Sequence, residues 1–549
     1  MATLHVANRD YTEWTFKNAT TSMATISPLT AKLFHNDTVD PSGQLISSPY
    51  RAKENICGVL LSSQKTYGRS NSGNKLLYKC VPDDPHLPCF LVPYDEKYIG
   101  FNKTRTDKYI SFKIKEWIDK HPLGLLTQTF GDLEDTEAYI AYQMTNKEIN
   151  DSLKNLNAAS LRSLREHNLD PIPLYCAGQA IEDRRSWPII SMDPAGCMDI
   201  DDAVGIHTLP NGDSILSIYI ANVPMMLEYL QLWTDLSERV ATIYLPDAKY
   251  PMLSGALSEN MCSLREKEDR VAFVMDITIS ETMYVSNISY TSTIIRIEKN
   301  YAYQDSELIA RADYKSILNI VYNLNTEYFA YVDEIKTSHH LVEYCMLFMN
   351  HECAKHLTQK KTGIYRAAVI KNKAETEAPA ALKHLIQNVA GEYCPYTQLK
   401  PHELIGLDCY LHITSPIRRV VDIVNMYEML KDNFQWSVEA QTFVQKWQGK
   451  IEMINQKSKA IRKLQNETEL LKVYKKNKDQ IYIGVVFALT ERMINGTVSY
   501  KYKVYIPATK LFTSVVSNKK FKDYTTAHFS AHLFLDEAKM TKKIRLQIV

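Results

Sequence analysis

The spacing of hydrophobic and polar residues predicts short strands in the first part of the chain. Ile56–Val81 is a series of short runs rich in β-branched and aromatic residues, separated by Ser, Asn and Gly. This pattern is typical of a small antiparallel barrel. A second region in the same style begins near Tyr109. Residues 1–50 show no firm period, so we interpret them as an extension ahead of the barrels.

The middle of the chain, residues 180–470, alternates between strand and helix patterns. Leu341–Leu357 has the length and composition of a largely buried helix, with Glu343 among mostly apolar neighbours. Farther on, apolar residues recur at intervals of three, four and seven, which predicts one amphipathic helix with a buried face. These residues are Phe443, Trp447, Ile451, Ile454, Ile461 and Leu464.

Strand patterns return at the C-terminal end together with positive charge. Ile481–Leu489 and Tyr500–Pro507 flank the dipeptide Asn495-Gly496, a strong signal for a β-hairpin. From Leu471 to Val549 there are 15 Lys and Arg residues against 5 Asp and Glu, so the rest of the chain carries a net charge of −9. A basic five-stranded barrel is typical of proteins that bind single-stranded nucleic acid. A barrel with a purely structural purpose is the alternative.

Length and composition limit the possible classes of protein. The 549 residues are too many for one ordinary core, so we expect several domains. There is no long apolar run, and the N-terminal residues lack the apolar core of a signal peptide. The ten cysteines include no C-x-x-C pair. We therefore expect a cytoplasmic or nuclear protein without a membrane segment, a disulfide framework or a zinc module.

Four aspartates crowd into the segment Ser191–Gly205. Like charges so close together raise one another's pKa, so a positive partner is expected. A calcium loop does not fit, because Ala203 stands at its third ligand position. Carboxylate oxygens without nearby His or Cys suit Mg²⁺ or Mn²⁺, and a solvated acidic loop is the remaining alternative. The four residues are Asp193, Asp199, Asp201 and Asp202.

Arg418 and Arg419 form a second candidate site. Thr414 or Ser415 is expected to cap a helix with Pro416 at its first position, so that both arginines fall in the first turn. Cations there oppose the helix dipole, and a bound phosphate would resolve the conflict. An acidic metal site with an arginine-lined phosphate site indicates phosphodiester chemistry.

These two stretches resemble motifs of a known family. DPAGCMDIDDA (Asp193–Ala203) and YLHITSPIRR (Tyr410–Arg419) are similar to signature motifs of the RNB family. This is the ribonuclease II and ribonuclease R group, which includes the catalytic subunit of the eukaryotic exosome. Further similarity, in the order of the family, lies in Tyr219–Val223, Ile243–Leu264, Leu341–Asn350 and Ile364–Ala368.

The resemblance implies an α+β protein of several domains. It covers residues 180–470 strongly and the flanking barrels more loosely. The implied order is an N-terminal extension (1–50), a cold-shock-like OB barrel (51–105), a second OB-like barrel (106–179), the RNB catalytic domain (180–470) and a basic S1-like OB domain (471–549).

The resemblance also implies roles for individual residues. Asp201 matches the aspartate whose loss stops cleavage, and Glu343 matches the first of two glutamates, the second of which is here Tyr344. For the metal the implied residues are Asp193, Asp199, Asp201 and Asp202; for substrate, Tyr244, Arg418, Arg419 and Tyr303, with Tyr301 as an alternative to Tyr303; for catalysis, Asp201, Arg418 and Glu343. The chain departs from the family pattern at Tyr219, Asn222, Tyr344, Val420 and Asn425.

The implied activity is processive hydrolysis of single-stranded RNA from its 3′ end to 5′ nucleoside monophosphates. The implied cofactor is Mg²⁺, or Mn²⁺, in a two-metal mechanism. The expected partner is single-stranded RNA, bound by a monomer that has no membrane segment. Two other classes stay open: a catalytically weak or silent RNA-binding factor with the same fold, and a metal nuclease that acts on DNA.

Overall fold

The structure is a computed structural model, and it divides the chain into two compact units. One unit contains Met1–Asn150 and Ala460–Val549, and the other contains Asp151–Lys459. The described residues are 1–18, 26–70, 74–95, 105–167, 175–176, 179–369, 382, 391–476, 480–494, 497–509, 511–536 and 540–549.

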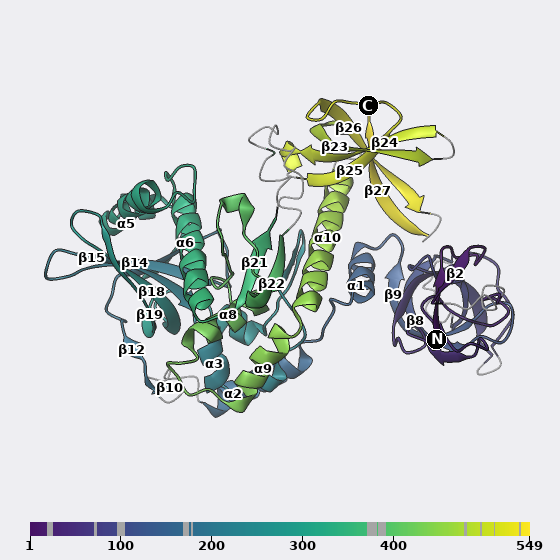
Figure 1. Ribbon diagram of the computed structural model, residues 1–549, viewed down its shortest axis with the longest axis horizontal. Helices are drawn as coiled ribbons and strands as arrows, with labels where there is room; N and C mark the ends of the chain where they lie inside the picture. The colour runs from purple at the N-terminus through teal and green to yellow at the C-terminus, as the bar shows by residue number, and fades with distance from the viewer. Residues whose placement is uncertain are drawn as a thin grey trace. The chain divides into compact units, whose positions relative to one another are not determined.

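The N-terminal part of the first unit combines a four-stranded sheet with a closed barrel (Figure 1). The sheet has the order β2-β1-β3-β4, and the barrel has the order β5-β6-β7-β9-β8. The strands are β1 (Ala2–Val6), β2 (Trp14–Lys17), β3 (Thr38–Val39), β4 (Leu45–Ser47), β5 (Ile56–Leu60), β6 (Leu76–Pro82), β7 (Phe90–Tyr94), β8 (Lys108–Glu116) and β9 (Leu123–Asp132).

Two predictions for this part were wrong. The described part of residues 51–105 contains three strands, and β8 and β9 close this barrel instead of forming a second barrel at 106–179. After β9 the chain forms the helices α1 (Thr136–Asn146) and α2 (Lys154–Glu166). Residues 1–50 are no loose extension either, because Leu4 and Phe34 share one core with barrel residues such as Phe90.

The C-terminal part of the first unit is a five-stranded antiparallel sheet with the order β25-β24-β23-β26-β27. The predicted hairpin strands pair as expected, although Asn495 and Gly496 lie outside the described residues. The predicted boundary at residue 471 falls inside α10 (Ile451–Lys476), whose Leu470 and Val473 pack against the core of this sheet. The strands are β23 (Tyr482–Ile494), β24 (Thr497–Ile506), β25 (Leu511–Ser517), β26 (Thr526–Asp536) and β27 (Thr541–Ile548).

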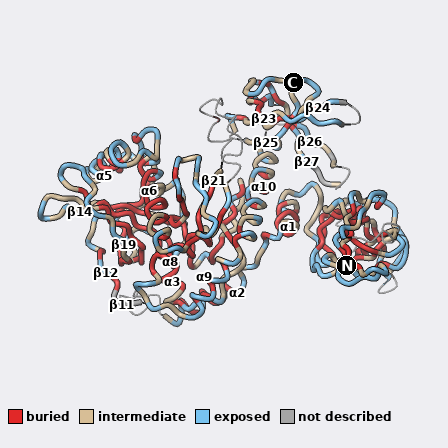
Figure 2. The backbone as a smooth tube through the Cα atoms, in the orientation of Figure 1, coloured by how far each residue is buried: buried red, intermediate tan, exposed pale blue. Residues whose placement is uncertain are grey.

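The second unit is built on a seven-stranded mixed sheet with the order β12-β19-β18-β15-β14-β13-β20. The interior strand β18 is buried along most of its length (Figure 2), as expected for a strand covered on both faces. The strands are β12 (Glu182–Asp183), β13 (Ile189–Asp193), β14 (Asp202–Thr208), β15 (Ser214–Ala221), β18 (Asp269–Ile279), β19 (Val285–Arg296) and β20 (Lys299–Ala302).

Helices and two-stranded sheets surround this sheet. Helix α6 packs against β13, and α5 packs against β14. The two-stranded sheets are β10 (Tyr175–Cys176) with β11 (Gln179–Ala180), β16 (Ile243–Leu245) with β17 (Ala248–Tyr250), and β21 (Ile364–Ala368) with β22 (Gly391–Pro395). The helices are α3 (Val223–Tyr229), α4 (Ser306–Ala310), α5 (Ala312–Asn323), α6 (Ser338–Gln359), α8 (Val420–Leu430) and α9 (Val438–Gln448).

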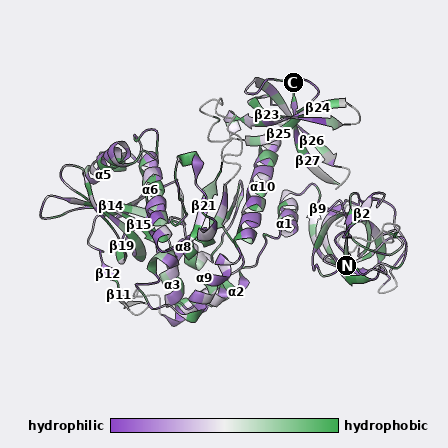
Figure 3. Cartoon of the chain, in the orientation of Figure 1, coloured by the Kyte–Doolittle hydropathy of each residue, from purple (hydrophilic) through white to green (hydrophobic). Residues whose placement is uncertain are grey.

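One of the two helices predicted from apolar residues is confirmed, and the other is divided in two. The predicted helix at Leu341–Leu357 is confirmed as α6, whose first turn is capped by the side chain of Thr337. The single helix predicted from Phe443 onward is two helices, α9 and α10, because α9 ends at Gly449. Figure 3 shows polar and apolar residues alternating along α10. In the described ranges, no helix combines the length and apolar character needed to cross a membrane.

Candidate active site

The four aspartates are gathered at one end of two neighbouring strands. Asp193 is the last residue of β13 and Asp202 the first of β14, and these strands pair antiparallel. The connection between them is fixed by Ser263, whose Oγ accepts a hydrogen bond from Ile200 N at 3.0 Å and donates one to Met198 O at 2.8 Å. The charges of these aspartates act on one another: Asp199 acts on Asp193, and Asp193 and Asp201 act on Asp202.

The side chain of Asp201 contacts two residues of the second motif. Its side chain accepts a hydrogen bond from the backbone N–H of Ile417 at 3.0 Å, and Arg418 Nε lies 3.4 Å from its other oxygen. Burial nevertheless raises the pKa of Asp201 to about 7, although Arg418 and the N–H of Ile417 oppose the shift. The two sequence motifs therefore meet at this carboxylate.

Asp193 and Asp202 are buried with too little positive charge nearby. Burial, helped by the charge of Asp199, raises the pKa of Asp193 to about 6. Burial and the charges of Asp193 and Asp201 raise the pKa of Asp202 well above its usual range. Asp193 Oδ2 is also buried without a hydrogen-bond partner. An unpaired buried carboxylate oxygen is costly, so this pair is suited to a bound cation.

Asp199 is bound on both oxygens. Tyr244 donates a hydrogen bond to Oδ2 at 2.8 Å, and Lys249 Nζ lies 2.9 Å from Oδ1. Tyr244 and Lys249 are directly opposite each other in the β16–β17 pair. The sequence analysis identified Tyr244 and missed Lys249, although the Leu-Pro-Asp turn between two short strands was a signal that could have placed the lysine beside it.

The four aspartates offer the type of ligand that a hard divalent cation prefers. All four side chains offer carboxylate oxygens, and one buried oxygen has no partner. Among the described residues, no group of three or more His, Cys, Asp or Glu side chains is arranged to hold a metal ion. Mg²⁺ commonly keeps several waters and binds one or two carboxylates together with substrate phosphates. A site completed by substrate is therefore consistent with this geometry.

The predicted helix start in the second motif was wrong. Helix α8 begins at Val420, with extended Arg419 before it, so neither arginine lies in the first turn and neither Thr414 nor Ser415 caps it. Asp422 occupies the first turn and accepts two hydrogen bonds from Arg419 at 2.8 Å and one from Ser415 N at 2.7 Å. An acidic residue is the favourable partner for that end of a helix.

Arg418 and Arg419 consequently differ in their surroundings. The guanidinium of Arg419 is held by the fully buried Asp422. The side chain of Arg418 is 47% exposed, and its Nη2 donates to Ser415 Oγ at 3.0 Å. Arg418 is therefore the arginine that can reach a phosphate, and the structure gives Arg419 a partner within the protein.

Backbone hydrogen bonds tie the second motif to the strand that carries Tyr244. Thr242 N donates to Arg418 O at 3.0 Å, and Val420 N donates to Val240 O at 3.0 Å. Tyr244 itself is 40% exposed, with its ring available to solvent. The aromatic side chain, the arginine and the aspartates are thus positioned by one connected piece of structure.

The remaining predicted residues fall in different places. Tyr303 lies beside the cluster: its N–H donates to Asp193 O at 3.2 Å, and burial together with Asp202 and Asp193 raises its pKa to about 12. Tyr301, the alternative, is buried and hydrogen-bonded to Arg311, so it cannot clamp a base. Glu343 is exposed on α6, where its carboxylate lies 3.9 Å from His339, so its nearest ionic partner is on its own helix rather than in the aspartate cluster.

The departures from the family pattern have structural partners. Asn222 caps α3 by accepting from Met225 N at 3.2 Å, and Asn425 bonds the backbone of Ile364 on both its oxygen and its nitrogen. Tyr219, Tyr344 and Val420 are buried. These residues therefore serve packing and backbone positioning in this chain.

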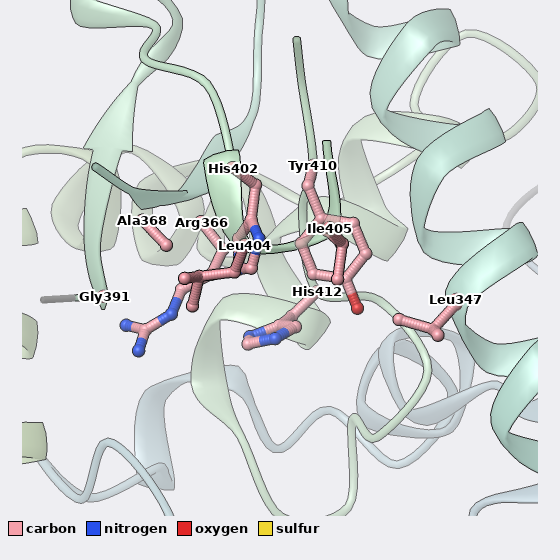
Figure 4. A pocket seen from close by; sticks show the side chains of 9 residues that line it. All are labelled: Leu347, Arg366, Ala368, Gly391, His402, Leu404, Ile405, Tyr410 and His412. Carbon is pink, nitrogen blue, oxygen red and sulfur yellow. The ribbon is translucent and has the colours of Figure 1, made fainter. Parts of the chain in front are cut away.

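A separate cavity of about 280 Å³ lies next to the second motif (Figure 4). It is lined by residues that include Arg366 from β21, Leu347 from α6 and the histidines His402 and His412. Burial lowers the pKa of His402 to about 4 and that of His412 well below its usual range, so both rings are neutral. None of the four aspartates lines this cavity.

Comparison with known proteins finds relatives of part of this chain. Residues 181–319 match the family described as the RNB domain. The Arabidopsis thaliana protein named exosome complex exonuclease RRP44 homolog A is 24% identical over 306 residues, which cover 52% of this chain and 30% of that protein. The chain thus spans less than a third of the length of this relative.

Two solved structures have a similar fold. Mycoplasma genitalium RNase R in complex with ribose-methylated single-stranded RNA has a TM-score of 0.68 and 16% identity, covering 100% of both chains. Yeast Ssd1, described as a pseudonuclease, has a TM-score of 0.57 and 13% identity, covering 90% of this chain and 69% of that one. Residues 181–319 of this chain are therefore similar to the RNB domain, and the fold of the chain is similar to that of RNase R.

Proposed function

We propose that this chain is a 3′-to-5′ exoribonuclease that hydrolyses single-stranded RNA to 5′ nucleoside monophosphates, with Mg²⁺ or Mn²⁺ as cofactor. One observation carries the proposal: buried carboxylates that lack a sufficient counter-charge lie next to a half-exposed arginine. Both groups favour phosphodiester hydrolysis, because a metal and an arginine neutralise the charge that develops on the phosphate.

The four aspartates would hold the cation or cations. Asp193 and Asp202 offer the undercompensated oxygens, and Asp201 and Asp199 complete the acidic site. When bound, the metal would lower the pKa of a water and stabilise the leaving 3′ oxygen. The N–H of Ile417 fixes the rotamer of Asp201, so this carboxylate keeps its direction when substrate enters.

Arg418 would bind the scissile phosphate. Its guanidinium is anchored by Ser415 Oγ and by Asp201, and its exposed edge can donate to phosphate oxygens. Arg419 supports this role indirectly, because its two bonds to Asp422 fix the turn that carries Arg418. We therefore assign Arg419 to positioning rather than to substrate binding.

Aromatic residues would hold the RNA near its 3′ end. Tyr244 presents a partly exposed ring at Asp199, and Tyr303 lies near Asp193 with its ring 5.2 Å from that of His339. Stacking on such rings is tolerant of sequence, as a general exonuclease requires. Glu343 is four residues from His339 on α6 and is the weakest of the proposed catalytic residues.

A catalytically silent RNA-binding factor is the second candidate, because one protein with a similar fold is a pseudonuclease. The four aspartates and Arg418 favour an active enzyme here. One assay separates the candidates: labelled single-stranded RNA and DNA of the same sequence, each with Mg²⁺ or EDTA. We expect mononucleotide release from RNA with Mg²⁺ only, and little from DNA. Equal cleavage of DNA would indicate the DNA nuclease, and RNA binding without cleavage the silent factor.

A further inference from the structure

Lys249 makes two ion pairs at the edge of the candidate active site. Its Nζ lies 2.9 Å from Asp199 Oδ1 and 3.2 Å from Glu259 Oε1. Glu259 belongs to a short helical turn, Leu257–Met261, and is not one of the proposed metal ligands. The ammonium group of Lys249 therefore bridges one carboxylate inside the site and one outside it.

Asp199 is the only one of the four aspartates with a lysine on it in the described part of the chain. Asp201 has the guanidinium of Arg418 at the longer distance of 3.4 Å, and Asp193 Oδ2 has no hydrogen-bond partner. Both oxygens of Asp199 already have a partner, Lys249 on Oδ1 and Tyr244 on Oδ2, so a divalent cation that binds Oδ1 of Asp199 would compete with Lys249. Two cations cannot share one carboxylate oxygen at full strength, because they repel each other.

We infer that the ammonium group of Lys249 competes with a metal ion for Asp199, and that it pairs only with Glu259 once the metal is bound. The inference rests on the proposed function, since it concerns the same metal site. The side chain of Lys249 is 28% exposed and that of Glu259 is 39% exposed, so the ammonium group has room to move. Glu259 thereby remains as an ion-pair partner for Lys249, which lowers the free-energy cost of displacing Lys249 from Asp199.

Metal binding without RNA tests the inference directly. Isothermal titration with Mn²⁺, and with Mg²⁺, is performed on the full chain and on three variants: Lys249→Met, Glu259→Gln and the double variant. Lys249→Met removes the competing charge and should tighten metal binding roughly three- to tenfold, the range expected for a partly buried ion pair. Glu259→Gln removes the second ion-pair partner of Lys249 and should weaken metal binding. In the Lys249→Met background, Glu259→Gln should have little effect.

Lys267→Met is the matched control, because Lys267 is 81% exposed and lies 4.0 Å from Glu266, its nearest partner. It should leave the metal affinity unchanged. Thermal unfolding of each variant checks the fold, and a Lys249→Arg variant, which keeps the charge, should retain the wild-type affinity.

Two results would overturn the inference. If wild type binds metal and Lys249→Met binds it equally or more weakly, Lys249 only supports the hairpin, and the proposed function survives. If neither wild type nor Lys249→Met binds metal, the competition and the metal-dependent function both fail. Binding by Lys249→Met alone would support the competition in its strongest form.

Discussion

Asp201 is buried, so its ionised form lowers the stability of the folded protein. Its pKa is raised to about 7 by burial, from a usual value near 4. The folded state therefore binds a proton more tightly than the unfolded state does. Its stability is highest below pH 4 as far as this group is concerned, and it falls as the pH rises through about 7.

Metal-free protein should accordingly lose stability between about pH 4 and pH 7. A shift of three pKa units corresponds to about 4 kcal/mol at most, and Asp193 adds to the same trend. Asp201→Asn removes the titrating group, so its melting temperature should fall less over this range. Thermal unfolding in EDTA at several pH values measures the difference. Parallel curves for the two proteins would show that Asp201 is ionised at little cost.

Tyr244 should determine where degradation stops. The residue is 40% exposed, and one base stacked on its ring would contribute about 1–3 kcal/mol. A short RNA depends on this contact more than a long RNA does, so Tyr244→Ala should give a longer limit product while long RNA is still degraded. Gel analysis of a 5′-labelled oligonucleotide measures the end product.

Tyr244→Phe provides the control for this prediction. It keeps the ring and removes the hydrogen bond to Asp199, so its limit product should match that of wild type. If Tyr244→Ala also stops at the wild-type length, the tyrosine is only a structural residue of the hairpin.

At the scale of elements, the sequence predicted helices and strands better than their boundaries. α6 was predicted from its apolar run, whereas α9 and α10 were merged because the apolar spacing continues across Gly449. The start of α8 was misplaced because Ser and Pro are good helix-start residues in general. Here Ser415 donates its N–H to Asp422 instead, and this partner is invisible in a pattern of helix-start residues.

The outer face of β24 is predicted to bind nucleic acid. Tyr502 and Val504 are buried, while Lys501, Lys503 and Tyr505 alternate with them on the other face. Lys503 Nζ lies 5.8 Å from the ring of Phe512 on β25. Lysines interleaved with aromatic rings suit a single strand of nucleic acid.

Lys501→Gln combined with Lys503→Gln should therefore weaken RNA binding and flatten its salt dependence. Removing one lysine that binds a phosphate reduces the slope of log affinity against log salt by about 1, so we expect a decrease of about 2 for the double variant. Lys360→Gln is the control, because Lys360 pairs with Asp432 in the other unit. Fluorescence anisotropy with labelled RNA at several salt concentrations gives the slopes. An unchanged slope would exclude this face as the RNA-binding surface.

At the scale of the whole molecule, the family resemblance indicated the fold more reliably than strand counting did. The sequence patterns predicted two barrels where the structure has one. The reason is that β5 pairs with β8, and these two strands lie far apart in the sequence. The acidic cluster was predictable, since its four residues are local. The roles of Lys249 and Ser263 were not, because each acts through a partner distant in the chain.

The proposed function depends on the aspartates next to Arg418, which would support the metal-dependent hydrolysis of RNA. The most direct test compares wild type and Asp201→Asn for two quantities, the single-turnover rate of mononucleotide release with Mg²⁺ and the affinity for the same single-stranded RNA. We predict a rate lowered by at least about 100-fold, because removing one preorganised group at a reacting centre commonly costs about this much, with an affinity within a few-fold of wild type. Hydrolysis by Asp201→Asn at the wild-type rate would contradict the account.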